Sequence, residues 1–136
     1  MKALSLTQPW ATLVALREKR IETRSWSTSY AGPLAIHAAK AFPGWAKELC
    51  EEEPFRSSLA VQSEQLPIGS VVCLVKLIGC RRTEDVRKQL TEKELAYGDY
   101  EDGRFAWFLE FDRIFEEPIL AKGNRLLWNW IAPWDN

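Results

Sequence analysis

The segment Lys19–Trp26 holds the side chains best suited to binding chemistry, and it alternates with a period of two. In an extended strand Glu22, Arg24 and Trp26 share one face, with neighbours about 7 Å apart because the rise is about 3.3 Å per residue. An arginine binds phosphate, carboxylate or a base edge through two N–H groups, a carboxylate accepts from an exocyclic amine, and an indole stacks on a base. The alternative is a solvated strand face with an internal Glu22–Arg24 ion pair.

The sequence Gln8-Pro9-Trp10 marks the start of the first predicted helix. Proline suits the first helical position, and the free N–H groups and the positive dipole end make a helix start a potential anion site. The alternative is an ordinary helix start with Trp10 in the core.

His37 is the single histidine of the chain, so every Ser-His or Cys-His nucleophile scheme has to use it. It lies in a predicted strand of small residues, with Lys40 three positions later. We favour a histidine that lines the core or a groove over a catalytic base. A metal site would need His37 together with scattered Cys or carboxylates that lack ligand spacing, so no metal site is expected.

Two later segments combine basic and aromatic residues. A turn beginning at Tyr97 is predicted to present Tyr97 and Tyr100, and the basic loop 122–125 runs into Trp128 and Trp130. Such interleaving suits single-stranded nucleic acid or a nucleotide. The tryptophans could equally close one end of a barrel as core residues, and we favour the core for at least one of them.

The charge balance limits the class of partner. The 136 residues carry 18 Lys and Arg against 19 Asp and Glu, a formal net charge of -1. This excludes a uniformly basic domain that binds long nucleic acid through counterion release alone, but it allows a local basic groove.

Other function classes lack their motifs. The chain contains no GxxxxGK[ST], GxGxxG or GxSxG sequence, so no cofactor is expected. The longest apolar stretch, Val71–Ile78, includes Lys76 and is too short for a membrane span, and the N-terminus does not read as a signal peptide. Three cysteines without CxxC spacing argue against a disulfide framework. We therefore expect a cytoplasmic protein with no membrane partner.

The elements that must position these side chains are several strands and a few helices, without regular βαβ alternation. This pattern predicts one α+β domain over residues 1–136, a small mixed β-barrel with flanking helices. The predicted strands are Ala3–Leu6, a strand from Ile21, Pro33–Ala39, Ser70–Arg81, Arg104–Phe115, Pro118–Leu120 and Leu127–Ile131. The predicted helices are Pro9–Glu18, Phe42–Glu53 and one within Thr83–Ala96.

The order of motifs along nearly the whole chain resembles the ASCH domain, a branch of the PUA-like superfamily. The matching pieces are residues 5–11, 19–24, 32–40, 69–75, 103–107 and 122–128. The resemblance implies a PUA-like barrel of about six strands with a cleft lined by the K-x-x-E-x-R segment and the first helix. It also implies a link to RNA or modified nucleosides.

One departure from the family concerns catalysis. The amidohydrolase branch, which acts on acetylated cytidine, carries K-x-x-T-x-R with catalytic Lys and Thr, whereas Glu22 stands at the Thr position here. Thr23 cannot replace that Thr, because a shift of one residue turns its hydroxyl to the other face of the strand. Glu18 also replaces the usual Gly before Lys19.

We therefore expect a cleft that binds RNA, a nucleotide or a modified nucleoside, in a monomer or weak dimer. The alternative is a small hydrolase, a ribonuclease or an amidohydrolase acting on an acylated nucleoside, with Lys19 and Glu22 as catalytic residues. A third interpretation is a protein-interaction domain with a vestigial cleft. The predicted ligand-binding residues are Gln8, Pro9, Trp10, Arg24, Trp26, His37, Lys40, Tyr97 and Trp128.

Overall fold

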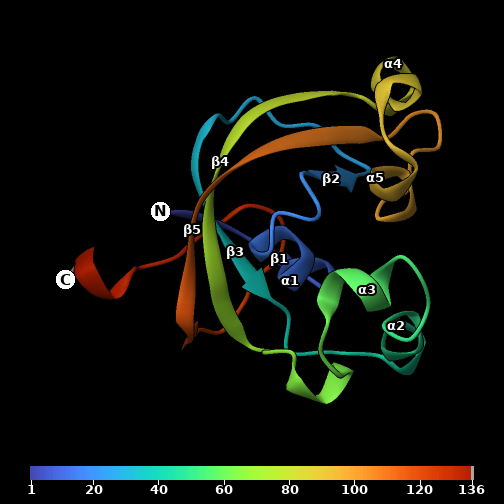
Figure 1. Ribbon diagram of the computed structural model, residues 1–136. Coiled ribbons are helices and arrows are strands. Elements are labelled where there is room, and N and C mark those ends of the chain that lie inside the picture. Colours follow the sequence, from blue (N-terminus) through green and yellow to red (C-terminus); the bar gives the residue numbers. More distant parts are fainter. Residues whose placement is uncertain (136) are drawn as a thin grey trace.

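The computed structural model describes residues 1–135 and contains one six-stranded mixed sheet with short helices around it (Figure 1). The strands are β1 (Lys2–Leu6), β2 (Ile21–Arg24), β3 (Gly32–Ala38), β4 (Ser70–Arg82), β5 (Phe105–Leu120) and β6 (Trp128–Asn129). The α-helices are α1 (Trp10–Ala15), α2 (Gly44–Leu49), α3 (Phe55–Leu59), α4 (Thr83–Val86) and α5 (Glu92–Ala96). Single 3₁₀ turns span Ser63–Gln65, Arg87–Gln89 and Pro133–Asp135.

The order of the strands in the sheet is β2-β5-β4-β3-β1-β6. β1 pairs in parallel with β3 and antiparallel with β6, and the other neighbours are antiparallel. The predicted α+β fold of six strands with flanking helices is confirmed. The sheet is strongly curved but not closed, because β2 and β6 remain its two edges.

The curvature comes from the two long strands, β4 and β5, which arch over α1 (Figure 1). Their pairing shifts register at three places, and β-bulges of this kind bend and twist a sheet. One shift lies beside Pro118, which explains why two predicted strands, Arg104–Phe115 and Pro118–Leu120, form the single strand β5. A bulge accommodates a proline that cannot donate to a regular ladder.

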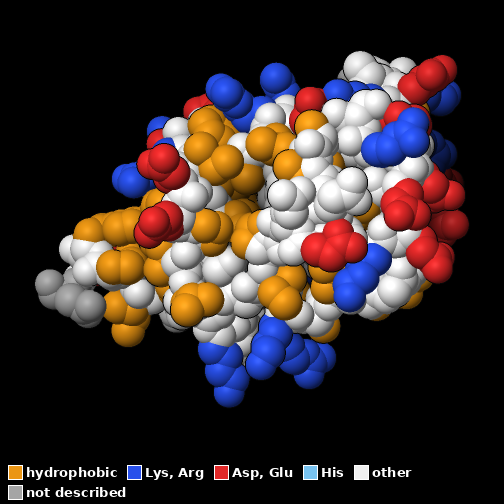
Figure 2. Space-filling model, turned by 60° about the horizontal axis from the view of Figure 1, so that its bottom comes forward, with side chains coloured by type: hydrophobic (Ala, Val, Ile, Leu, Met, Phe, Trp, Pro, Cys, Tyr) orange, Lys and Arg blue, Asp and Glu red, His pale blue; other side chains and the backbone are white. Residues whose placement is uncertain are grey.

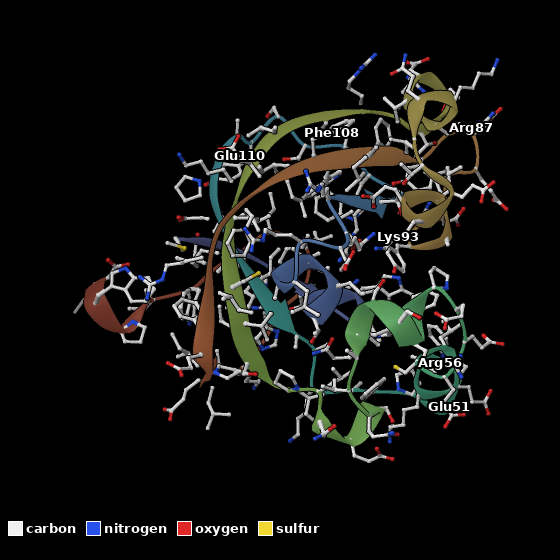
Figure 3. All side chains as sticks on the ribbon, viewed as in Figure 1. Glu51, Arg56, Arg87, Lys93, Phe108 and Glu110 are labelled. Carbon is white, nitrogen blue, oxygen red and sulfur yellow. The ribbon has the colours of Figure 1, made fainter. Side chains whose placement is uncertain are left out.

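The main core lies between the concave face of the sheet and α1. Ala11, Val14 and Ala15 of α1 pack against strand residues that include Trp107, which is completely buried. Side chains fill the space between the helix and the sheet (Figure 3). A second cluster joins Leu13 to α2 and α3 and includes Cys50, Phe55, Leu59, Leu66 and Tyr97.

The predicted helices are shorter than expected. The first begins at Trp10 and ends at Ala15, and the predicted Phe42–Glu53 helix becomes α2, which starts after Pro43 and ends at Leu49. Short helices without side-chain caps depend on packing against the sheet rather than on their own propensity.

All three cysteines are free thiols, and no helix within residues 1–135 is long and apolar enough to cross a membrane.

Candidate functional site

A cleft of about 630 Å³ opens where the end of β1, the start of α1 and β2 meet. The segment before β5 and one side chain of α2 complete its walls. Its lining comprises Ser5, Leu6, Thr7, Trp10, Glu22, Thr23, Arg24, Ser25, Trp26, Trp45, Ala96, Tyr97, Gly98, Asp99 and Arg104. The predicted cleft-lining motif residues Glu22 and Arg24 are therefore brought together in one cavity.

The Arg24 guanidinium is fixed on two sides. Its Nε and Nη2 atoms lie 3.0 Å and 2.8 Å from Oε2 of Glu22, and Nη2 also donates to the carbonyl oxygen of Ser5 at 3.0 Å. Its Nη1 atom has no hydrogen-bond partner among residues 1–135. The internal Glu22–Arg24 pair is present, and it holds Arg24 in one orientation while leaving one N–H₂ group for a ligand.

The alternation of β2 agrees with the period of two. Ile21 points to the opposite side and packs with Val86, Tyr100 and Ala106. The hydroxyl of Thr23 accepts a hydrogen bond from the backbone N–H of Asp99 at 3.1 Å, and both residues line the cleft.

The prediction that Trp26 continues the same strand face was wrong, because β2 ends at Arg24. Trp26 follows in a bend, where its ring meets Trp107 edge to face at 4.6 Å and its carbonyl accepts from the Trp107 indole. It still lines the cleft. The indole reaches the site through a turn in the chain and not through strand periodicity.

Lys19 lies behind the cleft and not in its lining. Its ammonium is completely buried, donates to the carbonyl oxygens of Ile21 and Tyr97 at 2.6 Å and 2.9 Å, and lies 3.4 Å from Oε1 of Glu22. Glu22 therefore bridges two cations, Lys19 on the inner side and Arg24 on the cleft side.

Tryptophans form one wall of the cleft. Trp10 and Trp45 lie 5.9 Å apart at an interplanar angle of 48°, and Trp45 is 60% exposed. An exposed indole at the mouth of a cavity offers a flat surface on which a base can stack. The sequence prediction missed Trp45, whose only signal was a large apolar residue on the polar side of a short helix.

Gln8 and Pro9 lie in the core and not in the cleft. The Gln8 amide donates to Thr12 Oγ1 and to the carbonyl of Pro67, and it accepts from the Thr12 backbone. These contacts use its hydrogen-bonding groups to tie the start of α1 to the segment before β4.

Tyr97 is not presented for stacking, contrary to the prediction for its turn. Its ring is buried among the residues of α2 and α3, and its hydroxyl donates to Ser58 Oγ at 2.5 Å. Tyr100 is buried as well. Tyr97 contributes to the site by accepting from Lys19 with its carbonyl oxygen.

The remaining predicted residues lie around a second cavity of about 860 Å³. His37 and Lys40 line it, together with the loop that follows β5. Ser5 lines both this cavity and the cleft. The predicted single site is therefore two neighbouring cavities that share one residue of β1.

His37 is held in place from both ring nitrogens. Nδ1 lies 3.0 Å from the Ser5 hydroxyl and Nε2 lies 2.7 Å from the carbonyl oxygen of Ala121. Burial lowers the pKa of His37 below 6.5, and the hydrogen bond to Ala121 opposes this shift only in part. Trp128 is buried behind the pair, where its indole donates to Ser5 Oγ at 3.2 Å, so it supports the second cavity without lining it.

Two further charged residues of the cleft, Asp99 and Arg104, were missed. Arg104 donates from Nε to the carbonyl oxygen of Asp99 at 3.1 Å, and its Nη2 lies 3.4 Å from the carbonyl oxygen of Thr23. Glu18, which replaces the usual glycine, lies outside the cleft lining and forms an ion pair with Lys93 of α5. No group of three or more His, Cys, Asp and Glu side chains within residues 1–135 is placed to hold a metal ion.

Comparison with known sequences identifies a family and two relatives. The ASCH domain profile matches residues 4–119. Activating signal cointegrator 1 of Mus musculus is 29% identical and its Homo sapiens counterpart 27% identical, each over 129 residues that cover 92% of this chain. The match covers 21% of each relative, so the chain spans about a fifth of their length.

Comparison with solved structures supports the fold. The crystal structure of ASCH from Zymomonas mobilis matches with a TM-score of 0.59 and 14% sequence identity. The match covers 98% of this chain and 89% of the other. At this level of identity the likeness concerns the architecture of the sheet and helices.

Proposed function

Because the chain belongs to the ASCH domain family, we propose that its cleft binds a nucleotide unit, either within a short single-stranded RNA segment or as a free or modified nucleoside. Arg24 contacts a phosphate or a base acceptor, Glu22 accepts from an exocyclic amine, and a base stacks against the tryptophan wall.

The observation that carries this proposal is the way in which hydrogen bonds hold the Arg24 guanidinium. Its Nε and Nη2 atoms are used by Glu22 and Ser5, which leaves Nη1 as an oriented donor beside the cleft. A guanidinium that is already fixed loses little conformational entropy when a ligand binds. This arrangement favours recognition of a single planar or anionic group.

The charge of the cleft supports a small ligand. Arg24 and Arg104 are balanced by Glu22 and Asp99 within the same lining. A track for long nucleic acid needs an excess of cations, and this cleft has none. A base with one or two phosphates fits this balance better than a duplex.

The burial of the Lys19 ammonium favours a binding function over hydrolysis. Two backbone carbonyls and Glu22 surround its buried ammonium, so it reaches no ligand in the cleft. A general base or electrostatic catalyst must come within hydrogen-bond distance of the reacting group. Hydrolysis through Lys19 and Glu22 remains the alternative that the test below includes.

Titration with hexauridylate, uridine and an acylated cytidine tests the proposal, with intrinsic tryptophan fluorescence as the readout. We expect affinity in the micromolar range and a salt dependence equivalent to one to three phosphate contacts, at roughly -0.7 per contact in a log–log plot. Absence of binding to every ligand, or the steep slope of a duplex binder, would overturn it. Release of uridine fragments or of free acid during the titration would favour the hydrolase.

A further inference from the structure

The second cavity differs from the cleft in its charge. Its lining contains three basic side chains, Lys40, Lys122 and Arg125, and no Asp or Glu. All three side chains are exposed, and none forms an ion pair within residues 1–135. Of the two cavities, this one therefore has the excess of cations that an anion requires.

The cavity is built where three segments distant in sequence converge. These are residues 39–40 after β3, 68–69 before β4, and 120–125, which comprise the last residue of β5 and the loop after it. The backbone N–H of Ala121 donates to the carbonyl of Gly69 at 3.1 Å and so ties two of the segments together. Figure 2 shows basic side chains gathered along the lower edge of the face seen there, apart from the acidic cluster at its right side.

The floor of the cavity holds the basic loop in position. His37 is 2% exposed, and its Nε2 lies 2.7 Å from the Ala121 carbonyl, which accepts only from a protonated Nε2. Nδ1 is then the acceptor for the Ser5 hydroxyl. A Cβ on Gly123 would lie 2.6 Å from the His37 ring and 2.8 Å from Ser5 Oγ, so the loop backbone passes directly against this pair.

This seating fixes the loop between Lys122 and Arg125. His37 faces the loop through the alternation of β3, because Leu34, Ile36 and Ala38 point into the main core and His37 points the other way, against Trp128. The cations are therefore carried by a loop that is ordered before a ligand arrives, which lowers the entropic cost of binding.

We propose that this second cavity binds a nucleotide phosphate through Lys40, Lys122 and Arg125. Ile68 and Leu120 at the rim, 42% and 84% exposed, provide apolar contact for the attached sugar or base. When the nucleotide belongs to a single strand, the strand crosses the end of β1 at Ser5, with a neighbouring base in the cleft. This last step rests on the proposed function of the cleft, whereas binding of the phosphate does not.

The first experiment uses ¹⁵N-labelled protein and follows the amide signals of Gly69 and Gly123 by NMR. The ligands are inorganic phosphate, uridine, uridine monophosphate and hexauridylate. We expect saturable shifts with phosphate and with both phosphorylated uridine ligands, and none with uridine. Tighter binding of hexauridylate than of the monophosphate would identify a strand as the source of the phosphate, and equal affinity would identify a free nucleotide.

The second experiment removes two cations and compares a charge-matched control. Lys122→Gln with Arg125→Gln should weaken phosphate-dependent binding about tenfold or more and reduce the salt slope for hexauridylate by about 1.4, the value for two contacts. Lys76→Gln with Lys88→Gln changes the net charge equally, and these exposed lysines line neither cavity. The control pair should leave the affinity within about twofold.

The outcomes separate this proposal from that of the cleft. Absence of saturable shifts at Gly69 and Gly123, or equal weakening by both double variants, overturns the phosphate site. If uridine monophosphate binds here but no ligand shifts signals of the cleft, the phosphate site stands and the proposed function fails. If only signals of the cleft respond, the proposed function stands and the phosphate site fails.

Discussion

The Arg24 guanidinium donates to the carbonyl oxygen of Ser5 at 3.0 Å, so a residue of the edge strand β2 is tied to the end of β1. The hydroxyl of the same serine lies 3.0 Å from His37 Nδ1 in the second cavity. Ser5 thus contacts Arg24 in the cleft and His37 at the floor of the second cavity. A shift of β1 at Ser5 therefore changes the geometry of both cavities.

Arg24→Lys should weaken binding of hexauridylate by about 1–3 kcal/mol and leave the melting temperature nearly unchanged. Lysine keeps the charge but lacks the planar fork that contacts Glu22 and Ser5 while presenting Nη1. Affinity by tryptophan fluorescence and stability by calorimetry are measured on one sample. Arg56→Lys, in an exposed ion pair with Glu53, is the control. A large loss of stability with unchanged affinity per folded molecule would show that Arg24 is purely structural.

Lys19→Met should destabilise the fold by about 3 kcal/mol, measured by urea denaturation. The substitution leaves the carbonyls of Ile21 and Tyr97 without their donor and Glu22 without its inner cation. Lys93→Met, which removes an exposed ion pair with Glu18, should cost no more than about 1 kcal/mol. A Lys19→Met protein of normal stability that has lost a hydrolytic activity would instead support the catalytic interpretation.

The free energy of unfolding should fall as the pH decreases from about 6.5 toward 5.5, since the unfolded chain takes up a proton on His37 that the folded chain resists. Burial lowers the pKa of His37 in the folded state, so its contribution is present above 6.5 and is lost below it. The slope from this one group is at most about 1.4 kcal/mol per pH unit. Urea denaturation of the wild type and of His37→Gln across this range checks the effect, and equal slopes would contradict it.

Gly123→Ala should destabilise the protein by about 1–3 kcal/mol and displace the loop from the second cavity. The added methyl would lie 2.6 Å from His37 Cε1 and 2.8 Å from Ser5 Oγ, both parts of a buried pair that cannot move freely. Gly44→Ala at the start of α2 meets nothing within 4 Å and should be neutral or slightly stabilising. Thermal unfolding of both variants tests this prediction. Equal melting temperatures would show that the loop moves to accommodate the methyl group without loss of stability.

Local patterns predicted the parts of the site that lie within one element. The orientation of Glu22 and Arg24 opposite to Ile21 follows from the pleat of β2 alone, and the structure has it, although Thr23 also reaches the lining of the cleft. The α+β class also followed, because apolar runs and turn residues mark strand positions, whereas the number of about six strands came from the family resemblance.

Contacts between distant elements were beyond prediction from one sequence. The pairing of Ser5 with His37 depends on the parallel register of β1 and β3, which no local pattern encodes. Lys19 begins the K-x-x-E-x-R segment, but its ammonium is buried and donates to the Tyr97 carbonyl after α5, a contact that no local pattern reveals. The division of the predicted residues between two cavities follows from these long-range pairings.

The place of β2 at the edge of the sheet governs when the cleft can form during protein synthesis. Within residues 1–135, β2 pairs with β5 alone, and β5 leaves the ribosome long after β2. A nascent chain that ends before β5 therefore holds Glu22 and Arg24 on a segment with no partner strand, and such non-local pairing forms late. Truncated translation products that lack β5 therefore carry Glu22 and Arg24 without the pairing that holds them in the proposed binding cleft.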